Sequence, residues 1–558
     1  MSYDTGDPLP PPTSAFSPFR HPVFRSVWIA TLASSFGGMI QGVGAAWMMV
    51  NLGASPQMVT LVQASITLPI VLLALVAGAL ADAFDRRVLM LAAQVFMLLV
   101  SAALAVSAYL GLATPWLLLF FTFLIGCGAA INAPAWQASV GAMVPRAEVP
   151  SAVALNSMGF NLARSLGPAL GGAIVAVAGA ALAFTINAFS YLGLIGVLAR
   201  WRPEQEPRLL PRESLGRAMA AGIRYAAMNR NINAAMLRGC VTGLGASAVP
   251  ALTPLIARDL IGGGPAVYGL LLGAFGVGAV VGAFWSHRLR SAYSTELIVR
   301  FALLASALGI GISALSTSLA ATMAAMALCG LGWVLVVSLL NATVQMSAPR
   351  WVVARALSLY QMTTFAGLAV GAWLWGGVTE GAGLGTALMA AASIQVGCAL
   401  LGLWFRLPET EDLDLTLATF PVPDVTVPVT GRTGPVVVTI EYRIAEPDVV
   451  AFLAAMADRK RIRRRNGAMR WSLLRDLADP EIWIERYQSP TWTEYLRHNQ
   501  RFTRDEAAIG ERIRALHRGP AAPAVRRMIE RQTGRLPDAT APDPGELAVP
   551  LTDHSRQA

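Results

Sequence analysis

Twelve apolar segments, each long enough to cross a lipid bilayer as a helix, constrain this chain more than any other feature. They lie near 24–50, 57–80, 88–110, 115–138, 151–177 and 180–199, and again near 233–257, 265–286, 295–315, 319–345, 352–377 and 383–405. Composition agrees, because 55% of the 558 residues are hydrophobic and only 14% are charged. These values exclude a disordered chain, a disulfide scaffold and an ordinary soluble enzyme. We therefore predict an all-α membrane protein with twelve transmembrane helices.

The second six segments repeat features of the first six, which predicts two pseudo-symmetric six-helix bundles over 21–200 and 233–406. Pro145-Arg146 and Pro349-Arg350 each precede the fifth segment of their half, at an offset of 204 residues. The same offset relates three further pairs: Met158 and Met362, Gly167 and Gly371, Gly172 and Gly376. Several matches in one register favour a duplicated unit over chance.

The net charge of +10 could indicate a nucleic-acid partner, but its distribution argues against one. The arginines concentrate in alternate loops and in the central segment 201–232, as expected of loops that face the cytoplasm. We predict a multi-pass protein of the cytoplasmic (inner) membrane with both termini inside, in contact with membrane lipid and with no nucleic acid. Segment 201–232 is predicted to be a linker carrying a surface helix from Pro211 to Arg230.

The composition becomes that of a soluble protein after Arg406. Residues 407–433 are predicted to be a linker. Residues 434–518 show a β-α-β-β-α pattern that suits a small α+β ferredoxin-like domain. Its first helix is expected to end at Gly467, and its second is expected to run from Thr491 to about Leu516. Residues 1–20 and 519–558 are predicted to be disordered.

The loop between the second and third segments carries Gly78, Asp82, Asp85, Arg86 and Arg87. The pattern resembles the signature loop of the major facilitator superfamily, although a glycine usually stands where this chain has Asp85. The resemblance implies a gating role, in which Asp82 meets the N-terminal end of the eleventh helix and stabilises the outward-facing state. Without Gly78 and Asp82, the two arginines alone could be simple topology anchors.

A second motif, in the fifth segment, resembles the G-P-x-x-G-G pattern of exporting members of that superfamily. Small residues allow close helix approach, and proline loosens the backbone hydrogen bonding, although such packing is also common in membrane helices generally. Together with the first segment and the loop between the second and third segments, the motif resembles exporters of the enterobactin-exporter and multidrug-efflux type over 20–406. Its residues are Arg164, Gly167, Pro168, Gly171 and Gly172.

Residues 434–518 resemble small dimeric domains of the antibiotic-biosynthesis monooxygenase type. The likeness rests on Arg465-Asn466-Gly467-Ala468, on Trp471, Asp476, Trp483 and Glu485, and on the run from Pro490 to His498. It implies a dimer through this domain and an assembly or regulatory role. Enzymatic versions need no cofactor, so the resemblance leaves catalytic activity open.

Polar side chains inside the apolar segments are candidate contacts of a small-molecule substrate, since polar groups are costly in lipid. Each amide could instead join helices, and Arg164 or Arg238 could extend to the membrane surface. The two arginines favour an anionic or amphiphilic substrate such as a catecholate-type siderophore. The candidates are Gln41, Asn132, Gln137, Asn161, Arg164, Arg238, Asn341 and Gln361.

The sequence thus predicts a secondary exporter that works by alternating access. The family implies proton coupling, yet no carboxylate falls in the middle of a segment, and Glu148 is a weak candidate carrier. No metal site, cofactor site or catalytic residue is predicted. The alternatives are a membrane-tethered enzyme whose chemistry lies in 434–518 and a non-transporting membrane scaffold.

Overall fold

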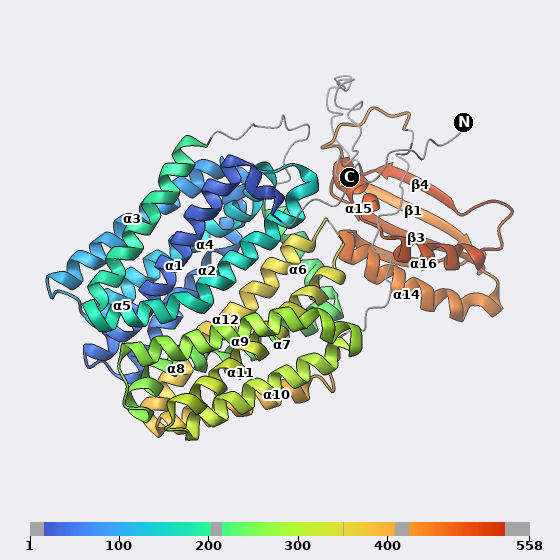
Figure 1. The fold of residues 1–558 in the computed structure, drawn as a ribbon. Helices are drawn as coiled ribbons and strands as arrows, with labels where there is room; N and C mark the ends of the chain where they lie inside the picture. The colour runs from blue at the N-terminus through green and yellow to red at the C-terminus, as the bar shows by residue number, and fades with distance from the viewer. Residues whose placement is uncertain (1–15, 202–214, 350, 408–422, 424, 531–558) are drawn as a thin grey trace. The chain divides into compact units, whose positions relative to one another are not determined.

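The computed structural model describes residues 16–201, 215–349, 351–407, 423 and 425–530. The chain divides into two compact units. The helical unit contains the described parts of 1–215, 231–344 and 357–409. The second unit contains 216–230, 345–356 and the described part of 410–558. Figure 1 shows the helices of the first unit and the small sheet of the second.

The first half of the helical unit begins with a short 3-10 helix, Ser17–Arg20, inside the segment predicted to be disordered. Proline opens three of its long helices, where the missing N–H costs no hydrogen bond, and Ser55 and Thr114 cap two of them with side-chain oxygens. The helices are α1 Pro22–Asn51, α2 Pro56–Ala83, α3 Arg86–Tyr109, α4 Pro115–Ser139 and α5 Val149–Arg200.

Helix α5 contains 52 residues and covers both the fifth and the sixth predicted segments. At 1.5 Å per residue an unbroken helix of this length would measure about 78 Å, more than twice the roughly 30 Å of a bilayer core. The helix is interrupted at Gly179, whose φ of 79° lies in the left-handed region that glycine adopts without strain. The break falls between the two predicted segments.

The second half of the helical unit contains α7 Arg230–Ala246, α8 Ala248–Leu255, α9 Pro265–Ala292, α10 Thr295–Leu315, α11 Leu319–Met346, α12 Val353–Ala382 and α13 Leu384–Leu401. A π-helical turn, Ile256–Leu260, follows α8. Helices α7 and α8 together with this turn occupy the single segment predicted near 233–257. Gly383, at a φ of 91°, forms the sharp connection between α12 and α13.

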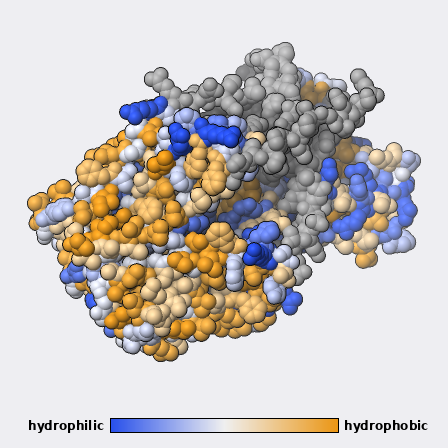
Figure 2. Space-filling view, in the orientation of Figure 1, coloured by the Kyte–Doolittle hydropathy of each residue, from blue (hydrophilic) through white to orange (hydrophobic). Residues whose placement is uncertain are grey.

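Ten helices of the described chain are long and apolar enough to cross a membrane. Among them, α5 counts once, and Arg230–Leu260 counts as one 31-residue helix. Large apolar side chains such as Val177, Phe284 and Leu315 are exposed on the outside of the unit. The visible face of the helices is accordingly mostly hydrophobic in Figure 2, as expected of a surface that faces lipid.

The second unit contains helix α6, Leu215–Met228, within the region predicted to be a surface helix. The predicted start of that helix, Pro211, lies outside the described residues. The unit also contains a four-stranded sheet, and its elements are β1 Val436–Arg443, α14 Val449–Asn466, β2 Met469–Arg475, β3 Ile482–Ser489, α15 Trp492–Gln500, α16 Arg504–Ala515 and β4 Ala524–Ile529.

All strand pairs in the sheet are antiparallel, and the strand order is β2-β3-β1-β4. One face of β1 contributes Val436, Val438, Ile440 and Tyr442 to a buried core that also contains Phe452 of α14. Gly467 ends α14 with a φ of 119°, which explains why the predicted helix stops there.

Two expectations for this domain require correction. The predicted helix from Thr491 to about Leu516 is two helices, because Thr503 and Glu506 form a capping box that starts α16. Strand β4 lies within 519–558, which the sequence predicts to be disordered. Its sequence, AVRRMI, lacks the alternation that identifies strands, and its order comes from pairing with β1.

Candidate functional site

A cavity of about 540 Å³ lies inside the first half of the helical unit, a volume typical of small-molecule sites. Trp28, Trp136 and Tyr191 contribute aromatic surface to it. No residue among those described in its lining carries a formal charge. Its amide residues, which come from α1, α3, α4 and α5, are Gln41, Gln94, Asn132, Gln137 and Asn156.

Three buried polar atoms that belong to lining residues have no hydrogen-bond partner among the described residues. They are Oγ1 of Thr31, Oε1 of Gln94 and Oδ1 of Asn132. Buried polar atoms are satisfied in the great majority of native structures. Three such atoms around one cavity therefore indicate hydrogen-bonding capacity for whatever occupies it.

Gln41 also belongs to a buried network that joins α1, α3 and α5. Nδ2 of Asn187 donates to Oε1 of Gln41, to Oγ of Ser101 at 3.2 Å and to the hydroxyl oxygen of Tyr191 at 3.1 Å. Ser101 in turn donates to Oε1 of Gln41 at 3.3 Å and to the carbonyl of Phe184 at 3.2 Å. The network therefore fixes one wall of the cavity through neutral groups.

Of the substrate contacts expected from the sequence, the cavity brings together Gln41, Asn132 and Gln137. Its lining does not include the other five, namely Asn161, Arg164, Arg238, Asn341 and Gln361. Sequence reasoning missed Gln94, Asn156 and Asn187. Gln94 and Asn187 are the only amides in the third and sixth predicted segments, and that isolation in apolar surroundings could have identified them.

Arg238 lies in an internal ion-pair cluster of the second half. Its side chain is fully buried, and its Nη1 is 2.6 Å from Oε2 of Glu296. Glu296 also accepts from Nε of Arg300 at 2.7 Å and from the backbone N–H of Leu407 at 3.0 Å. Because Glu296 is in the first turn of α10, the sequence alone gave no reason to place it beside Arg238. The cluster supplies Arg238 with its counter-charge.

Arg164 is placed differently, with its guanidinium 5.3 Å from the centre of the Phe275 ring on α9. That geometry is a cation–π contact. It joins α5 of the first half to α9 of the second.

The glycines around Arg164 allow α5 to approach two other helices. A Cβ atom on Gly172 would lie 2.6 Å from the carbonyl oxygen of Pro265, and one on Gly276 would lie 2.4 Å from Cα of Ser165. A Cβ on Gly167 or Gly171 would instead meet α1, at Met39 and Ile40 respectively. Backbones this close tolerate no side chain between them. The exporter-type motif therefore packs α5 against both α1 and α9.

The expected gating loop connects α2 and α3. Asp85 caps α3 by accepting from the backbone N–H of Arg87 at 2.8 Å. Arg87 donates from Nε to the carbonyl of Leu198 at 2.8 Å and from Nη2 to that of Ala199 at 2.7 Å, at the C-terminal end of α5. A cation is favourable there because the last carbonyls of a helix lack partners. Gly78 and Asp82 lie in α2, and Arg86 begins α3.

The second unit carries a buried charged network. Glu485 is fully buried and accepts from Nε of Arg459 at 2.9 Å, from Nε of Arg463 at 3.3 Å and from Nε1 of Trp471 at 3.0 Å. Burial alone would raise the pKa of Glu485, but the two guanidinium groups outweigh it and hold that pKa at about 2. Burial and the charge of Arg463 lower the pKa of His498 to about 3. The network is therefore ionised at Glu485 and neutral at His498.

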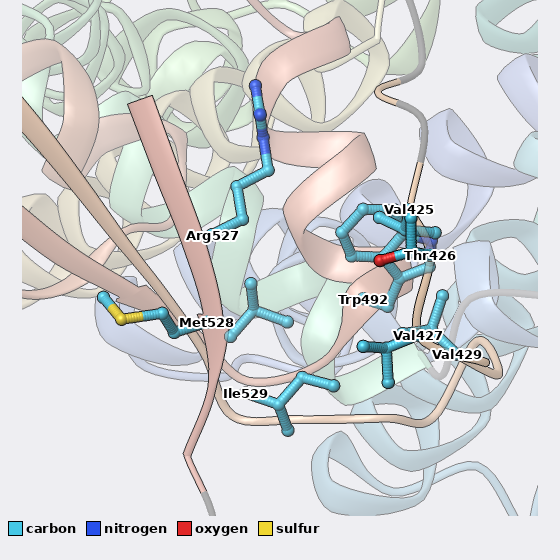
Figure 3. Close-up of a pocket in the computed structure, with 9 residues that line it drawn as sticks. Val425, Thr426, Val427, Val429, Trp492, Arg527, Met528 and Ile529 are labelled. Carbon is cyan, nitrogen blue, oxygen red and sulfur yellow. The ribbon is translucent and has the colours of Figure 1, made fainter. Parts of the chain in front are cut away.

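A second cavity, of about 560 Å³, lies in the same unit between β4, the start of α15 and residues 425–429 (Figure 3). Val427, Val429, Trp492 and Ile529 give it an apolar lining. Arg527 contributes its charged side chain, whose Nε donates to the hydroxyl of Tyr495 at 2.7 Å. None of the residues through which the sequence resembles a monooxygenase, apart from Trp492, is among those described in this lining.

An apolar helical unit that encloses a neutral polar cavity defines the class of the protein, a multi-pass membrane transporter. The chain belongs to the family described as "Transmembrane secretion effector", whose model matches residues 13–534, and through it to the major facilitator superfamily. The match confirms the superfamily that the loop and the glycine motif predicted.

Several curated exporters are similar over most of their length. The enterobactin exporter EntS of Salmonella typhi is 29% identical over 395 residues, which cover 69% of this chain and 91% of that protein. EntS of Escherichia coli is 27% identical over 391 residues, with the same two coverages. These matches favour a transporter over the membrane-tethered enzyme.

Solved transporters share the fold. A bacterial homologue of the human lysosomal transporter Spinster aligns with a TM-score of 0.54 at 13% identity, over 70% of this chain and 96% of its own. The POT family transporter PepTSo aligns with a TM-score of 0.56 at 13% identity, over 70% of this chain and 97% of its own. At such identities the likeness concerns the fold alone.

Proposed function

We propose that this protein exports a small amphiphilic molecule across the cytoplasmic membrane by alternating access between two six-helix halves. The carrying observation is the cavity of the first half, where Thr31, Gln94 and Asn132 present buried polar atoms without partners among the described residues. The similarity to enterobactin exporters supports the outward direction and a siderophore, a drug or a related metabolite as substrate.

The cavity favours a substrate that combines aromatic surface with several hydrogen-bonding groups. Trp28 and Trp136 offer stacking surfaces, and amides such as Asn132 and Gln137 can both donate and accept. A catecholate siderophore has both properties. For an anionic substrate, Arg164 is the better candidate of the two arginines, because Arg238 already has Glu296 as its counter-ion.

Twelve spans, with both termini in the cytoplasm, form part of this proposal. The 52-residue α5 with its break at Gly179 supports two spans, and the 30 residues of α12 are enough for one more. The loop arginines of the sequence support the orientation. In this arrangement, the superfamily resemblance implies a gating role for Asp82 with the eleventh span in the outward-facing state, and Arg87 ties the loop to the end of α5.

Proton coupling is the proposed energy source. Glu148, the residue indicated by the sequence, has Oε2 3.0 Å from Nε2 of His21, so the two groups can share a proton. Glu148→Gln should abolish the dependence of transport on a pH gradient. Substrate exchange in the absence of a gradient should continue.

For the soluble domain, we propose a ferredoxin-like fold that serves assembly or regulation, including the formation of a dimer. The β-α-β-β-α-β order and the β2-β3-β1-β4 arrangement support the fold. The dimer itself stays a prediction from the resemblance to monooxygenase-type domains.

Everted membrane vesicles provide the test, since an exporter accumulates its substrate in them. Vesicles containing the protein should accumulate a catecholate siderophore or an amphiphilic dye faster when a pH gradient is imposed. Asn132→Ala and Gln94→Ala should each raise the KM severalfold, whereas Asn161→Ala, which alters an amide outside the cavity lining, should not. Equal uptake by vesicles with and without the protein, across siderophores and dyes, would contradict the proposal.

A further inference from the structure

The soluble domain contacts two segments of its own unit that lead directly into helices of the transporter. One is α6, whose last residue, Met228, is separated from α7 by Asn229 alone. The other is residues 347–349 and 351–352, which lie between α11 and α12. We refer to the contacts of α14 to α16 with these two segments as the clamp.

The first half of the clamp joins the end of α14 to α6. The guanidinium of Arg465 lies 4.8 Å from the centre of the Tyr225 ring, which is 2% exposed. Nε of Arg224 donates to the backbone carbonyl of Arg465 at 3.3 Å. Arg465 is held in place by an ion pair with Glu506 at the capping box of α16. The position of α6 is therefore set by the folded core of the soluble domain.

The second half of the clamp joins the end of α15 to the segment before α12. The guanidinium of Arg501 lies 4.3 Å from the centre of the Trp351 ring. The rings of Tyr225 and Trp351 also meet edge to face, with their centroids 5.6 Å apart. These contacts make one continuous stack from Arg465 through the two rings to Arg501.

Hydrogen bonds tie the same two segments together beneath the rings. The hydroxyl of Tyr225 donates to the carbonyl of Ser347 at 3.4 Å, and Nδ2 of Asn229 donates to that carbonyl at 3.0 Å. The end of α6 is thus linked to the segment between α11 and α12, and both are linked to the soluble domain. Any motion that separates α6 from that segment must break these contacts.

We propose that the clamp controls the conformational equilibrium of the transporter by holding α6, which lies in the segment between the two halves, against the connection between α11 and α12 in the second half. This inference rests on the proposed function, because it assumes that transport moves the two halves that this segment joins. The soluble domain then acts as a regulator, and a ligand or partner that loosens α14 or α15 would change transport without touching the cavity.

The test alters the two aromatic rings of the clamp, so that the ion pairs inside the soluble domain, such as Arg465 with Glu506, stay intact. Tyr225→Leu and Trp351→Leu each remove a ring that receives an arginine. Arg464→Ala is the matched control, since Arg464 is an exposed neighbour of Arg465. All variants are made in the full chain with its four cysteines replaced and with Gln137→Cys as a reporter inside the cavity.

Alkylation of that reporter by an impermeant maleimide, in everted and in right-side-out vesicles, measures which side the cavity faces. Loss of one cation–π contact should change the ratio of the two alkylation rates about three- to tenfold. Arg464→Ala should leave it unchanged. An unchanged ratio in both ring variants, with normal thermal unfolding, would overturn the proposal. A changed ratio, in a protein that with its natural Gln137 transports none of the substrates tried, would support the clamp and count against the proposed function.

Discussion

The two halves of the helical unit stabilise their interiors with different chemistry. In the first half, Gln41, Ser101, Asn187 and Tyr191 form a network of neutral hydrogen bonds beside a cavity. In the second half, Arg238, Glu296 and Arg300 form an ion-pair cluster. Neutral groups can exchange partners with a ligand at little cost, whereas a buried charge cannot lose its partner. The comparison therefore supports the proposal that the first half recognises the substrate, with a more rigid interior in the second half.

Glu296→Gln should produce the largest effect. It leaves the fully buried Arg238 without a counter-charge, and breaking a buried pair in this way costs about 3–5 kcal/mol. Thermal unfolding of the detergent-purified protein measures the loss. The double variant Arg238→Met/Glu296→Leu removes both charges and should recover most of the stability. If Glu296→Gln and the natural protein were equally stable, the ion-pair cluster would not stabilise the second half, and the two halves would not differ in this respect.

In the soluble domain, by comparison, buried ionisable groups should make stability depend on pH. Glu485 has a pKa of about 2 in the folded state, below the ordinary 4.5. Its contribution to the free energy of unfolding is therefore complete above pH 4.5 and is lost as the pH falls toward 2. That shift corresponds to about 3 kcal/mol. Because the pKa of His498 is lowered from 6.5 to about 3, a further loss of stability begins as the pH falls below 6.5. Denaturant unfolding of the full chain, monitored between pH 7 and pH 3, should show both losses.

The matched variant for this pH dependence is Glu485→Gln. It should be less stable at pH 7 and should lose less stability between pH 4.5 and pH 3. An identical pH dependence in the two proteins would show that Glu485 is not the group responsible.

Asn187→Ala should have an intermediate effect. It removes the donor shared by Gln41, Ser101 and Tyr191, and a buried partner left unsatisfied costs about 1–3 kcal/mol. Asn161→Ala, on the same helix but outside this network, serves as the control. The assignment would fail if the two variants had the same midpoint of thermal unfolding.

Asn132→Ala should have the smallest effect on stability and a selective effect on transport. Oδ1 of Asn132 has no partner among the described residues, so its removal leaves no group unpaired and should change the free energy of unfolding by less than about 1 kcal/mol. The KM for transport should rise by a factor of about three to ten, as expected for one lost hydrogen bond. A fall in stability without a change in KM would make Asn132 a structural residue.

Much of the fold could be predicted because hydrophobic length and the glycine motif are local in sequence. The apolar segments, the helix stop at Gly467 and the superfamily all followed from short stretches. The partner of Arg238 could not be predicted, since Glu296 is 58 residues away and looks like a helix-start residue. Likewise, β4 owes its order to its pairing with β1, and the sequence Ala524–Ile529 carries no local sign of it.

The packing of α5 on α9 has a consequence for how the two halves can move. The two helices meet through Gly172, Gly269 and Gly276, where backbone lies close to backbone and the neighbouring side chains, Ser165 and Ala169, are small. A conventional helix interface interlocks, so that sliding requires each side chain to leave its groove and change rotamer. A glycine-lined contact has no interlocking side chains of this kind. Sliding of one half past the other along this contact is then opposed mainly by the cation–π contact of Arg164 with Phe275 and by the lipid and the ends of the helices.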